Sequence, residues 1–553
     1  MNFELTSKYR ELIVWFFIFC LLISLPIRFY FLQKNDFDIA LDKSKASSER
    51  SIKLLSRRGK ILDRNFQILA EDIPAYEIGI QINNFSFDPS HISSISKILK
   101  IDSQNLKNKL SNKKRQYIVL DHNASQDELN ELDEEKIPGL RSISKYKRSY
   151  PEGEIISQVV GLTNFENKGQ EGIELSVNKK LSGKDGLKKY VRTNKGEIIE
   201  TNINPPSHGQ DVRVTLDAKL QYLVYRELEK AFNYFDASSA SAILVDLNSK
   251  DILAMANYPS FDPNDRRGMN PALLANRSAT DLFEPGSTVK PLALAGLLKE
   301  EIIYKDEIIK TSPGYIEYEG FLTSDFKDYG TLSLSEVISK SSNVAMVKLC
   351  DKSNPEKIVK NFYQWGFGKY INEIFISNRE GYLPSSANLS AREKVSLCYG
   401  YGLQVTLIQL VGAYTALFSN GQFQGLNLIS DSYNGFEDIV ISKEIAMEIK
   451  DMLSEAVNTG TGRNALVKNT KIIGKTGTTK ISTNQGYTEK SFNASFVGMA
   501  ELKDKNFVLG ILVRDAKENG QGGGQVATPI FSEIIKSIKN TLWWNLKNWY
   551  PTI

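Results

Sequence analysis

The chain has 553 residues, enough for two or three domains, and 41% of them are hydrophobic, which suits globular folding. Its formal net charge of +4 is too small to indicate nucleic-acid binding. The three histidines are His91, His122 and His208, so none lies beyond His208. Serine chemistry in the second half of the chain must therefore use another amine or a carboxylate as its base.

The first apolar segment lies near the N-terminus. Residues 12–27 are uncharged and mostly apolar, and residues 29–32 extend the run past Arg28. A membrane span needs about 20 residues, so the segment is long enough if Arg28 reaches the interface. A cleaved signal peptide is the alternative. No small-x-small cleavage site follows, which favours an uncleaved anchor.

The next region, from residue 51 to about residue 208, is lysine-rich and has short strand-like pieces without a reactive cluster. The Pro- and Gly-containing segment 204–209 then marks a break. After it we expect a helix from Asp217 to about Ala231 and a hairpin around Asn248 and Ser249. Further strands are expected at 472–478, 494–499 and 507–513, and a terminal helix at 529–540.

A candidate nucleophile and base lie in the segment 286–290, which reads Gly-Ser-Thr-Val-Lys. A helix starting near Pro285 places Ser287 and Lys290 on one face, one turn apart. The apolar run 292–298 suits a helix buried in a large core. Poor solvation disfavours the charged form of Lys290, whose free amine can then take the proton of Ser287. A lone Ser-x-x-Lys is usually solvated helix surface, so further motifs are needed.

Two further motifs follow in order. Ser341, Ser342 and Asn343 lie between a capping-box pattern at 333–336 and a helical stretch at 344–349. Lys475, Thr476 and Gly477 lie in the strand-like segment 472–478. Asn469 stands where a phosphate-binding Walker A loop requires glycine, which argues against nucleotide binding. Each motif alone has a purely structural interpretation: the first can be a helix N-cap, and the second can be a strand end. The ordered set Ser-x-x-Lys, Ser-x-Asn and Lys-Thr-Gly is typical of penicillin-binding proteins and serine β-lactamases.

On these motifs the chain resembles a class B penicillin-binding protein of the division type, over nearly its whole length. The segment 276–291 looks like the division-type active-site segment, and Ser-x-Asn rather than Ser-x-Asp as second motif also favours that type. Further segments resemble family motifs: 58–65, 148–151, 169–174, 402–406 and 458–462. The chain departs from the family pattern at three positions: Phe66 replaces Gly, Asn493 replaces His and Gly522 replaces Tyr.

The resemblance implies an α+β fold. Its transpeptidase domain has an antiparallel sheet flanked by helices plus an all-helical lobe, preceded by an elongated, mostly β pedestal and one transmembrane helix. The expected boundaries are a cytoplasmic tail at 1–11, an anchor at 12–32, a stalk at 33–50, a pedestal of the dimerisation type at 51–210 and a transpeptidase domain at 211–545. The cysteines allow either three free thiols or a bridge between Cys350 and Cys398.

The resemblance also implies a function: a peptidoglycan D,D-transpeptidase that crosslinks stem peptides of the septal wall during division and is a target of β-lactams. Ser287 would be the nucleophile and Lys290 the base, while Ser341 and Asn343 would help to protonate the leaving group and orient the substrate. Lys475, Thr476, Gly477 and Thr478 would hold the substrate carboxylate, and the amides of Ser287 and Thr478 would form the oxyanion hole. No cofactor or metal is expected.

The expected partners are peptidoglycan stem peptides, a SEDS-family glycan polymerase, other divisome proteins and the cytoplasmic membrane, with the bulk of the chain in the periplasm at the septum. Three alternatives stay open at this point. One is an elongation-type transpeptidase. The second is a D,D-carboxypeptidase or β-lactamase, which uses water in deacylation. The third is a catalytically silent penicillin-binding sensor or scaffold, for which only a short N-terminal tail is available as an output segment.

Overall fold

The computed structural model describes residues 2–111, 115–192, 198–266, 268–370, 378–430, 438–483, 486–503 and 505–547. It divides into two compact units. The first consists of Met1–Arg57 and Gly183–Gly209. The second consists of Arg58–Ser182 and Gln210–Ile553.

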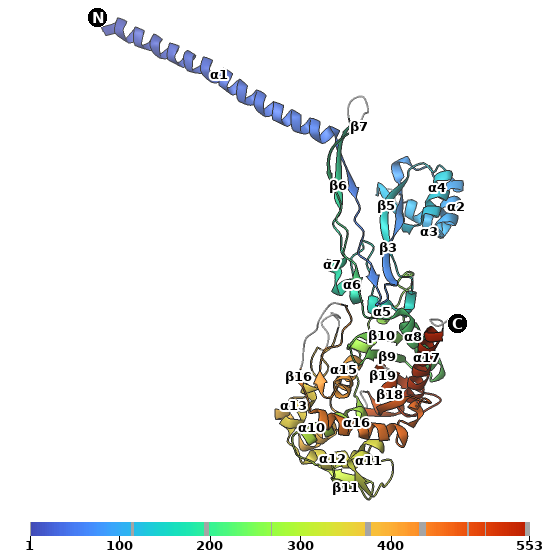
Figure 1. Ribbon diagram of the computed structural model, residues 1–553. Coiled ribbons are helices and arrows are strands. Elements are labelled where there is room, and N and C mark those ends of the chain that lie inside the picture. The colour runs from blue at the N-terminus through green and yellow to red at the C-terminus, as the bar shows by residue number, and fades with distance from the viewer. Residues whose placement is uncertain are drawn as a thin grey trace. The chain divides into compact units, whose positions relative to one another are not determined.

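The first unit joins a long helix to a small sheet (Figure 1). Helix α1 spans Asn2–Ser48. Its part Lys8–Lys34 is long and apolar enough to cross a membrane, and its side chains are exposed, so it fits a single-pass anchor. The antiparallel sheet has the order β1-β6-β7 and consists of β1 (Glu49–Leu54), β6 (Gly186–Arg192) and β7 (Ile198–Asn204).

The second unit opens with a mixed module. Strand β3 (Ile68–Gln81) pairs with β2 and β4 in a sheet of order β4-β3-β2-β8, and β5 also pairs with β3. The other elements of this module are β2 (Ile61–Leu62), β4 (Tyr117–Ala124), β5 (Leu140–Ser149), β8 (Val212–Arg213), α2 (Pro89–Ile98), α3 (Ser103–Leu110), α4 (Gln126–Glu134), α5 (Ser157–Val160), α6 (Gly172–Ser176) and α7 (Asn178–Leu181).

The helices α2 to α4 are an addition to the mostly β module expected from the sequence. Each is short and buries only two apolar side chains, so its helical periodicity is weak. Their capping residues were the available signals: Asp88, Asp102 and Ser125 each accept a hydrogen bond from the first turn of the helix that follows.

A buried ion network ties together three segments that resemble family motifs. Glu174 accepts 2.6 Å hydrogen bonds from the Nε atoms of both Arg58 and Arg148. Asp72 accepts from Arg148 at 3.2 Å and from the backbone N–H of Arg58 at 2.7 Å. Burying such charges is costly unless they are paired and hydrogen-bonded, as they are here. The network therefore joins three segments that are far apart in the sequence.

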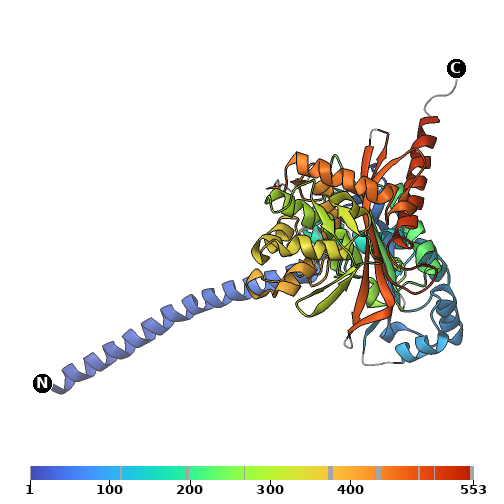
Figure 2. The same cartoon turned by 90° about the horizontal axis from the view of Figure 1, so that it is seen from below.

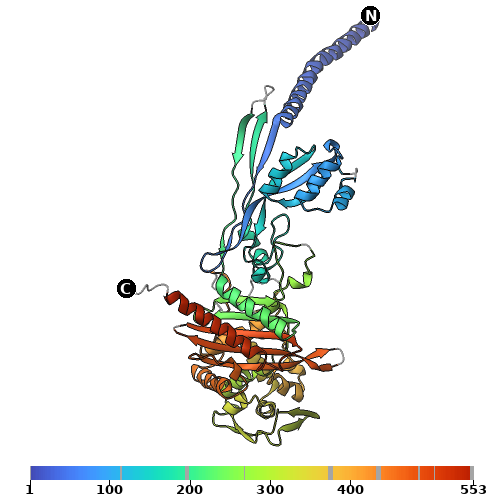
Figure 3. The same cartoon turned by 90° about the vertical axis from the view of Figure 1, so that its right-hand side faces the viewer.

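The C-terminal domain is built on a five-stranded antiparallel sheet of order β10-β9-β19-β18-β17. Helices α8 and α17 lie side by side on one face (Figure 3), and α15 and α16 contact the sheet from the other (Figure 2). The predicted sheet between terminal helices is thus confirmed. The bounds are β9 (Ser239–Asp246), β10 (Ile252–Tyr258), β17 (Lys471–Thr483), β18 (Gly486–Leu502), β19 (Lys505–Ala516), α8 (Ala218–Tyr234) and α17 (Ala527–Lys547).

A lobe of helices and small hairpins is inserted between β10 and β17. Its helices are α9 (Arg277–Thr280), α10 (Lys290–Lys299), α11 (Leu334–Ser339), α12 (Asn343–Asp351), α13 (Pro355–Gln364), α14 (Ala391–Leu397), α15 (Leu407–Phe418) and α16 (Lys443–Asn458). Its strand pairs are β11 (Ile308–Lys310) with β14 (Thr331–Ser333), β12 (Tyr315–Tyr318) with β13 (Phe321–Ser324), and β15 (Gln422–Phe423) with β16 (Asp438–Ile439). The predicted capping box of α11 is confirmed: Ser333 and Glu336 cap each other's backbone.

Candidate active site

Ser287 lies in a tight turn at the start of the lobe. The turn is a 3₁₀ helix, η4 (Gly286–Val289), that leads into α10. The Lys290 N–H donates to the Ser287 carbonyl, because Pro291, the α-helical donor for that carbonyl, has no N–H. The predicted helix from Pro285 is thus corrected to a 3₁₀ turn followed by an α-helix. In 3₁₀ geometry side chains three residues apart eclipse, so Ser287 and Lys290 still share one face.

The turn is pressed against strand β17. Gly286 has a φ of +55°, and a Cβ atom there would lie 2.6 Å from Thr479 Cγ2. Thr479 Oγ1 in turn donates to the Glu284 carbonyl at 3.2 Å. Only glycine accommodates both this backbone conformation and this close approach. The local fold therefore places the Ser287 turn directly beside the strand that carries Lys475.

Lys290 is completely buried and reaches the second motif. Its Nζ donates to Asn343 Oδ1 at 2.7 Å, to the Ser341 carbonyl at 2.5 Å and to Ser341 Oγ at 3.3 Å. The half-buried Ser287 hydroxyl has no hydrogen-bond partner among the described residues. Lys290 thus contacts the second motif directly, and its relation to Ser287 is set by the turn that they share.

The second motif forms the start of α12. Ser342 is the N-cap, and its Oγ accepts from the Ala345 N–H at 3.0 Å. Ser341, one residue earlier, has a φ of +59°, which is uncommon for a residue with a side chain. Asp325 accepts from Ser342 Oγ at 2.6 Å and from the Asn343 N–H at 2.5 Å. The motif is therefore held by a carboxylate outside it.

Lys475 approaches the same serine from the sheet. It lies in β17, is completely buried, and its Nζ donates to Ser341 Oγ at 3.1 Å and to the Thr476 carbonyl at 3.2 Å. Thr476 Oγ1 also lies 2.8 Å from Thr461 Oγ1. The three predicted motifs therefore converge, with Ser341 Oγ within hydrogen-bond distance of both lysines.

Both lysines have depressed pKa values. Burial, followed by the charge of Lys475, holds the pKa of Lys290 well below its ordinary value, and the Asp325 carboxylate opposes this shift. Burial lowers the pKa of Lys475 to about 7. A buried ammonium loses solvation, and a second one nearby adds repulsion, so the neutral amine is favoured. The lowered pKa of Lys290 therefore favours the unprotonated amine, which is the form that a base requires.

The rest of the third motif lies against the Ser287 turn. A Cβ atom at Gly477 would lie 2.3 Å from Ser495 Oγ and 2.8 Å from the Pro285 carbonyl, so glycine permits this close packing. Thr478 is exposed, and its Oγ1 accepts from the Gly523 N–H at 2.9 Å. An accessible threonine hydroxyl in the strand that carries Lys475 suits recognition of a carboxylate.

Comparison with known proteins shows the family to which the chain belongs. The family model for the penicillin binding protein transpeptidase domain matches residues 240–536. This chain belongs to that family. The model for the penicillin-binding protein dimerisation domain matches residues 53–214.

The similarity to curated relatives extends over nearly the whole penicillin-binding protein. It is 31% identical to the probable peptidoglycan D,D-transpeptidase PbpC of Pseudomonas aeruginosa, over 96% of this chain and 94% of that one. It is 30% identical to the peptidoglycan D,D-transpeptidase FtsI of Escherichia coli K12, over 97% and 93%. The predicted family resemblance is thus confirmed.

Solved structures agree on the fold. The transpeptidase domain of Burkholderia pseudomallei penicillin-binding protein 3 matches with a TM-score of 0.54 and 32% identity, over 59% of this chain and 95% of that one. Penicillin binding protein 3 from Mycobacterium tuberculosis matches with a TM-score of 0.69 and 24% identity, over 89% and 97%. The second match, given its low identity, concerns the fold alone.

One departure from the family pattern has a structural meaning. Phe66, which stands where the family usually has glycine, has a φ of +65°. Glycine enters this left-handed region freely, which accounts for the usual residue. In this penicillin-binding protein the Arg213 guanidinium lies over the Phe66 ring, 5.2 Å from its centroid, a favourable cation–π contact.

Sequence reasoning missed two residues that support the site. Asp325 lies in the loop after β13 and was not singled out, since single acidic residues in loops are common. Thr461 lies in the 458–462 segment, which was matched to the family without a role; the structure places its hydroxyl against Thr476. The disulfide left open by the sequence is present, between Cys350 in α12 and Cys398 after α14.

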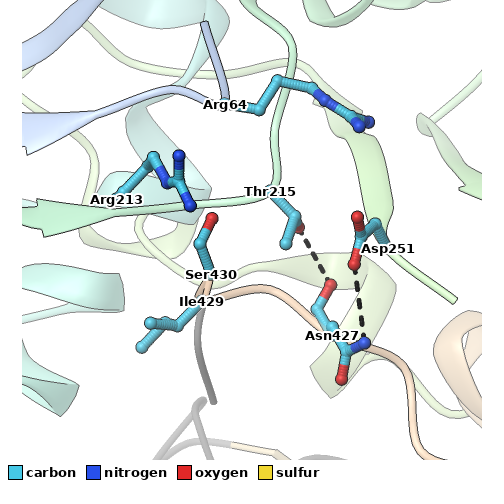
Figure 4. Close-up of a pocket in the computed structure, with 7 residues that line it drawn as sticks. All are labelled: Arg64, Arg213, Thr215, Asp251, Asn427, Ile429 and Ser430. Carbon is cyan, nitrogen blue, oxygen red and sulfur yellow. Dashed lines mark hydrogen bonds between the residues drawn. The ribbon is translucent and has the colours of Figure 1, made fainter. Parts of the chain in front are cut away.

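A separate cavity of about 290 Å³ contains none of the predicted catalytic residues. Arg64 and Arg213 border it from two segments, and Asn427 donates to Asp251 and accepts from Thr215 Oγ1 on its other side (Figure 4). It is lined by residues such as Arg64, from the segment that the dimerisation-domain model matches, and Asp251, from the segment that the transpeptidase model matches. The full lining is Arg64, Arg213, Thr215, Asp251, Asn427, Ile429 and Ser430.

Proposed function

We propose that this penicillin-binding protein crosslinks stem peptides of the septal peptidoglycan through an acyl-enzyme on Ser287. It is a serine-type D-Ala-D-Ala transpeptidase by family. The observation that carries the residue assignment is the convergence of two buried lysines on Ser341, beside the turn that presents Ser287. The chain beyond His208 has no histidine, and burial disfavours the charged form of Lys290, so we assign the base role to its amine.

In acylation, Ser287 Oγ attacks the carbonyl between the two terminal D-alanines, and neutral Lys290 takes the hydroxyl proton. The backbone amides of Ser287 and Thr478 stabilise the oxyanion. The C–N bond then breaks, and the departing D-alanine receives a proton from the Lys290–Ser341 side of the site. In deacylation, the amine of a neighbouring stem attacks the ester, forms the crosslink and returns a proton to Ser287.

The resting hydrogen bonds of Lys290 are compatible with this role. Its Nζ contacts Ser341 and Asn343 rather than Ser287. Catalytic hydrogen bonds are often long or misaligned before substrate is bound, so geometry without substrate does not exclude a base. The 3₁₀ turn keeps Ser287 and Lys290 on one face, and proton transfer between the two side chains requires this of the backbone.

The third motif supplies the substrate's carboxylate site. Lys475, in its charged form, and the hydroxyls of Thr476 and Thr478 offer an ammonium and two donors to the terminal carboxylate of the stem peptide. Gly477 keeps this strand close to the Ser287 turn. Asn343 Oδ1 accepts from Lys290 and its Nδ2 donates to the Ser324 carbonyl, which leaves one amide proton to orient the substrate amide.

We place the enzyme in the cytoplasmic membrane at the division septum, with its bulk in the periplasm. The apolar helix Lys8–Lys34 supports anchoring, and the Cys350–Cys398 disulfide suits an oxidising compartment. A SEDS-family glycan polymerase and other divisome proteins are the proposed partners. The proposed boundaries are 1–11 for the cytoplasmic tail, 12–32 for the anchor, 33–50 for the stalk, 51–210 for the pedestal and 211–545 for the transpeptidase domain.

The test is covalent labelling with a fluorescent penicillin, followed by peptide mass spectrometry. We expect label on Ser287 and none in Ser287→Ala. An unlabelled wild-type protein, or label that persists in Ser287→Ala, contradicts the nucleophile assignment. Depletion in cells tests the division role: filaments without septa support it, and rounded cells indicate elongation instead.

A further inference from the structure

Asp325 makes a concentrated set of contacts with the second motif. Its Oδ2 accepts from Ser342 Oγ at 2.6 Å. Its Oδ1 accepts from the backbone N–H groups of Asn343 and Val344, at 2.5 and 3.0 Å. One carboxylate therefore binds three consecutive residues at the point where α12 begins.

These contacts complete the N-terminus of α12. The first N–H groups of a helix have no partner inside it and carry partial positive charge, so a carboxylate is favourable there. Ser342 Oγ accepts from the Ala345 N–H, and Asp325 accepts from the two preceding N–H groups, those of Asn343 and Val344. The preceding Ser341 is left-handed, a conformation that persists only where the surroundings impose it. Asp325 contributes to those surroundings because it accepts hydrogen bonds from Ser342, the residue next to Ser341, and from the Asn343 N–H.

The segment held in this way is the one that holds the base. Lys290 Nζ donates to Asn343 Oδ1 at 2.7 Å and to the Ser341 carbonyl at 2.5 Å. Lys475 donates to Ser341 Oγ at 3.1 Å. A shift of residues 341–343 would therefore move the acceptors of both lysines together.

We propose that Asp325 is a positioning residue for acylation, whose carboxylate fixes residues 341–343 and, through them, the amine of Lys290 beside Ser287. The inference deepens the proposed function and rests on Ser287 and Lys290 as nucleophile and base. Asp325 acts through other residues, so its role differs from those of the three motifs.

The charges around Lys290 support the same role. Burial and Lys475, on β17, lower the pKa of Lys290, whereas Asp325, after β13, raises it. Ser341 and Asn343, from the start of α12, face the amine as uncharged groups. Tyr329 also interacts with the Asp325 charge, and its pKa is raised, mainly by burial. Without the Asp325 charge the pKa of Lys290 falls further.

The experiment compares Asp325→Ala and Asp325→Asn with matched changes at Asp328. Asp328 lies three residues further on, is exposed, and also accepts from a hydroxyl and a backbone N–H, those of Ser312 and Gly330. Its partners in the described part of the chain do not include residues 341–343, so its variants control for general effects on this loop. The readouts are the rate constant for penicillin acylation of Ser287, its pH profile and the melting temperature.

We expect Asp325→Ala to acylate about a hundredfold more slowly, the loss typical of a displacement on the order of 1 Å. Asp325→Asn keeps an acceptor for the two N–H groups and a donor for Ser342, so its loss is smaller. Its acid limb moves to lower pH, because Lys290 becomes unprotonated at lower pH without the carboxylate charge. The Asp328 variants keep the wild-type rate and profile.

The proposal is overturned if Asp325→Ala has the same melting temperature as its control, Asp328→Ala, and acylates at the wild-type rate. If Asp325→Ala does not fold, Asp325→Asn decides: a wild-type acylation rate contradicts the proposal, and a reduced rate together with an acid limb at lower pH supports it. Labelling of the wild-type protein distinguishes a failure of the proposed function from a failure of the role proposed for Asp325. Absence of label on wild-type Ser287 refutes the proposed function, whereas labelled wild type with unaffected Asp325 variants refutes the role of Asp325 alone.

Discussion

The Nζ atoms of Lys290 and Lys475 both lie within hydrogen-bond distance of one hydroxyl, Ser341 Oγ, at 3.3 and 3.1 Å. A hydroxyl has two acceptor sites and one proton, so it can accept from one lysine while donating to the neutral amine of the other. Two buried charges of the same sign at this separation disfavour each other. The arrangement therefore favours one neutral and one charged lysine, which is the division of roles that acylation requires.

The first prediction concerns pH. The acylation rate constant should rise with pH as Lys290 loses its proton and fall above about pH 7 as Lys475 loses its charge. Lys475→Arg should abolish the falling limb, because a guanidinium stays charged, although the rate is reduced. A stopped-flow pH series with a labelled penicillin measures both. A falling limb that survives in Lys475→Arg would assign it to another group.

The second prediction concerns stability. The pKa of Lys475 is about 7 in the folded protein and 10.5 ordinarily, so between these values the unfolded state binds more protons and stability rises with pH. At neutral pH, Lys475→Met should raise the free energy of unfolding by on the order of 1–3 kcal/mol while acylation is lost. The gain should shrink toward the ordinary lysine pKa. Urea denaturation at several pH values tests this, and a gain independent of pH would contradict it.

The third prediction concerns the serine turn. Gly286→Ala should abolish acylation and destabilise the domain, because its Cβ would lie 2.6 Å from Thr479 Cγ2 at a φ of +55°. Gly320→Ala is the matched control: φ is +74° there, and nothing lies within 4 Å of an added Cβ. It should cost only about 1–2 kcal/mol of backbone strain and leave acylation unchanged. Equal effects of the two substitutions on acylation would show that packing against β17 is unimportant.

The fourth prediction concerns the disulfide. Protein purified without reductant and then unfolded should react with maleimide at one cysteine, Cys20, and at all three after reduction. The Cys350→Ala, Cys398→Ala double variant should lose up to about 4 kcal/mol of stability, because the bridge closes a loop of 48 residues. Three reactive thiols before reduction would refute the bridge and its support for an oxidising compartment.

The parts of the site that were predictable are those encoded locally. Ser342 and Ser333 are N-cap residues and indicate where helices begin. The hydrophobic residues before Lys475 indicate a buried strand. The 3₁₀ turn at Ser287 was also within reach, since Pro291 removes the donor that an α-helix requires. The family motifs gave the convergence of these segments, which local patterns alone do not contain.

Asp325 was not predictable in the same way. It lies 16 residues before Ser341 in the sequence, and its partners are brought to it only by the packing of the β12–β13 hairpin against α12. Glu174 is a similar case, because its two arginine partners come from segments 116 and 26 residues away. Such contacts depend on tertiary placement, and a single sequence holds no periodic signal for them.

The central claim is that the amine of Lys290 replaces the absent histidine as the base for Ser287. The most direct measurement is the rate constant for Ser287 acylation in Lys290→Arg, whose side chain keeps the charge but does not release a proton. The account predicts a loss of about 10²–10⁴-fold with the protein still folded. Acylation of Ser287 at a rate close to wild type in the folded variant would contradict it.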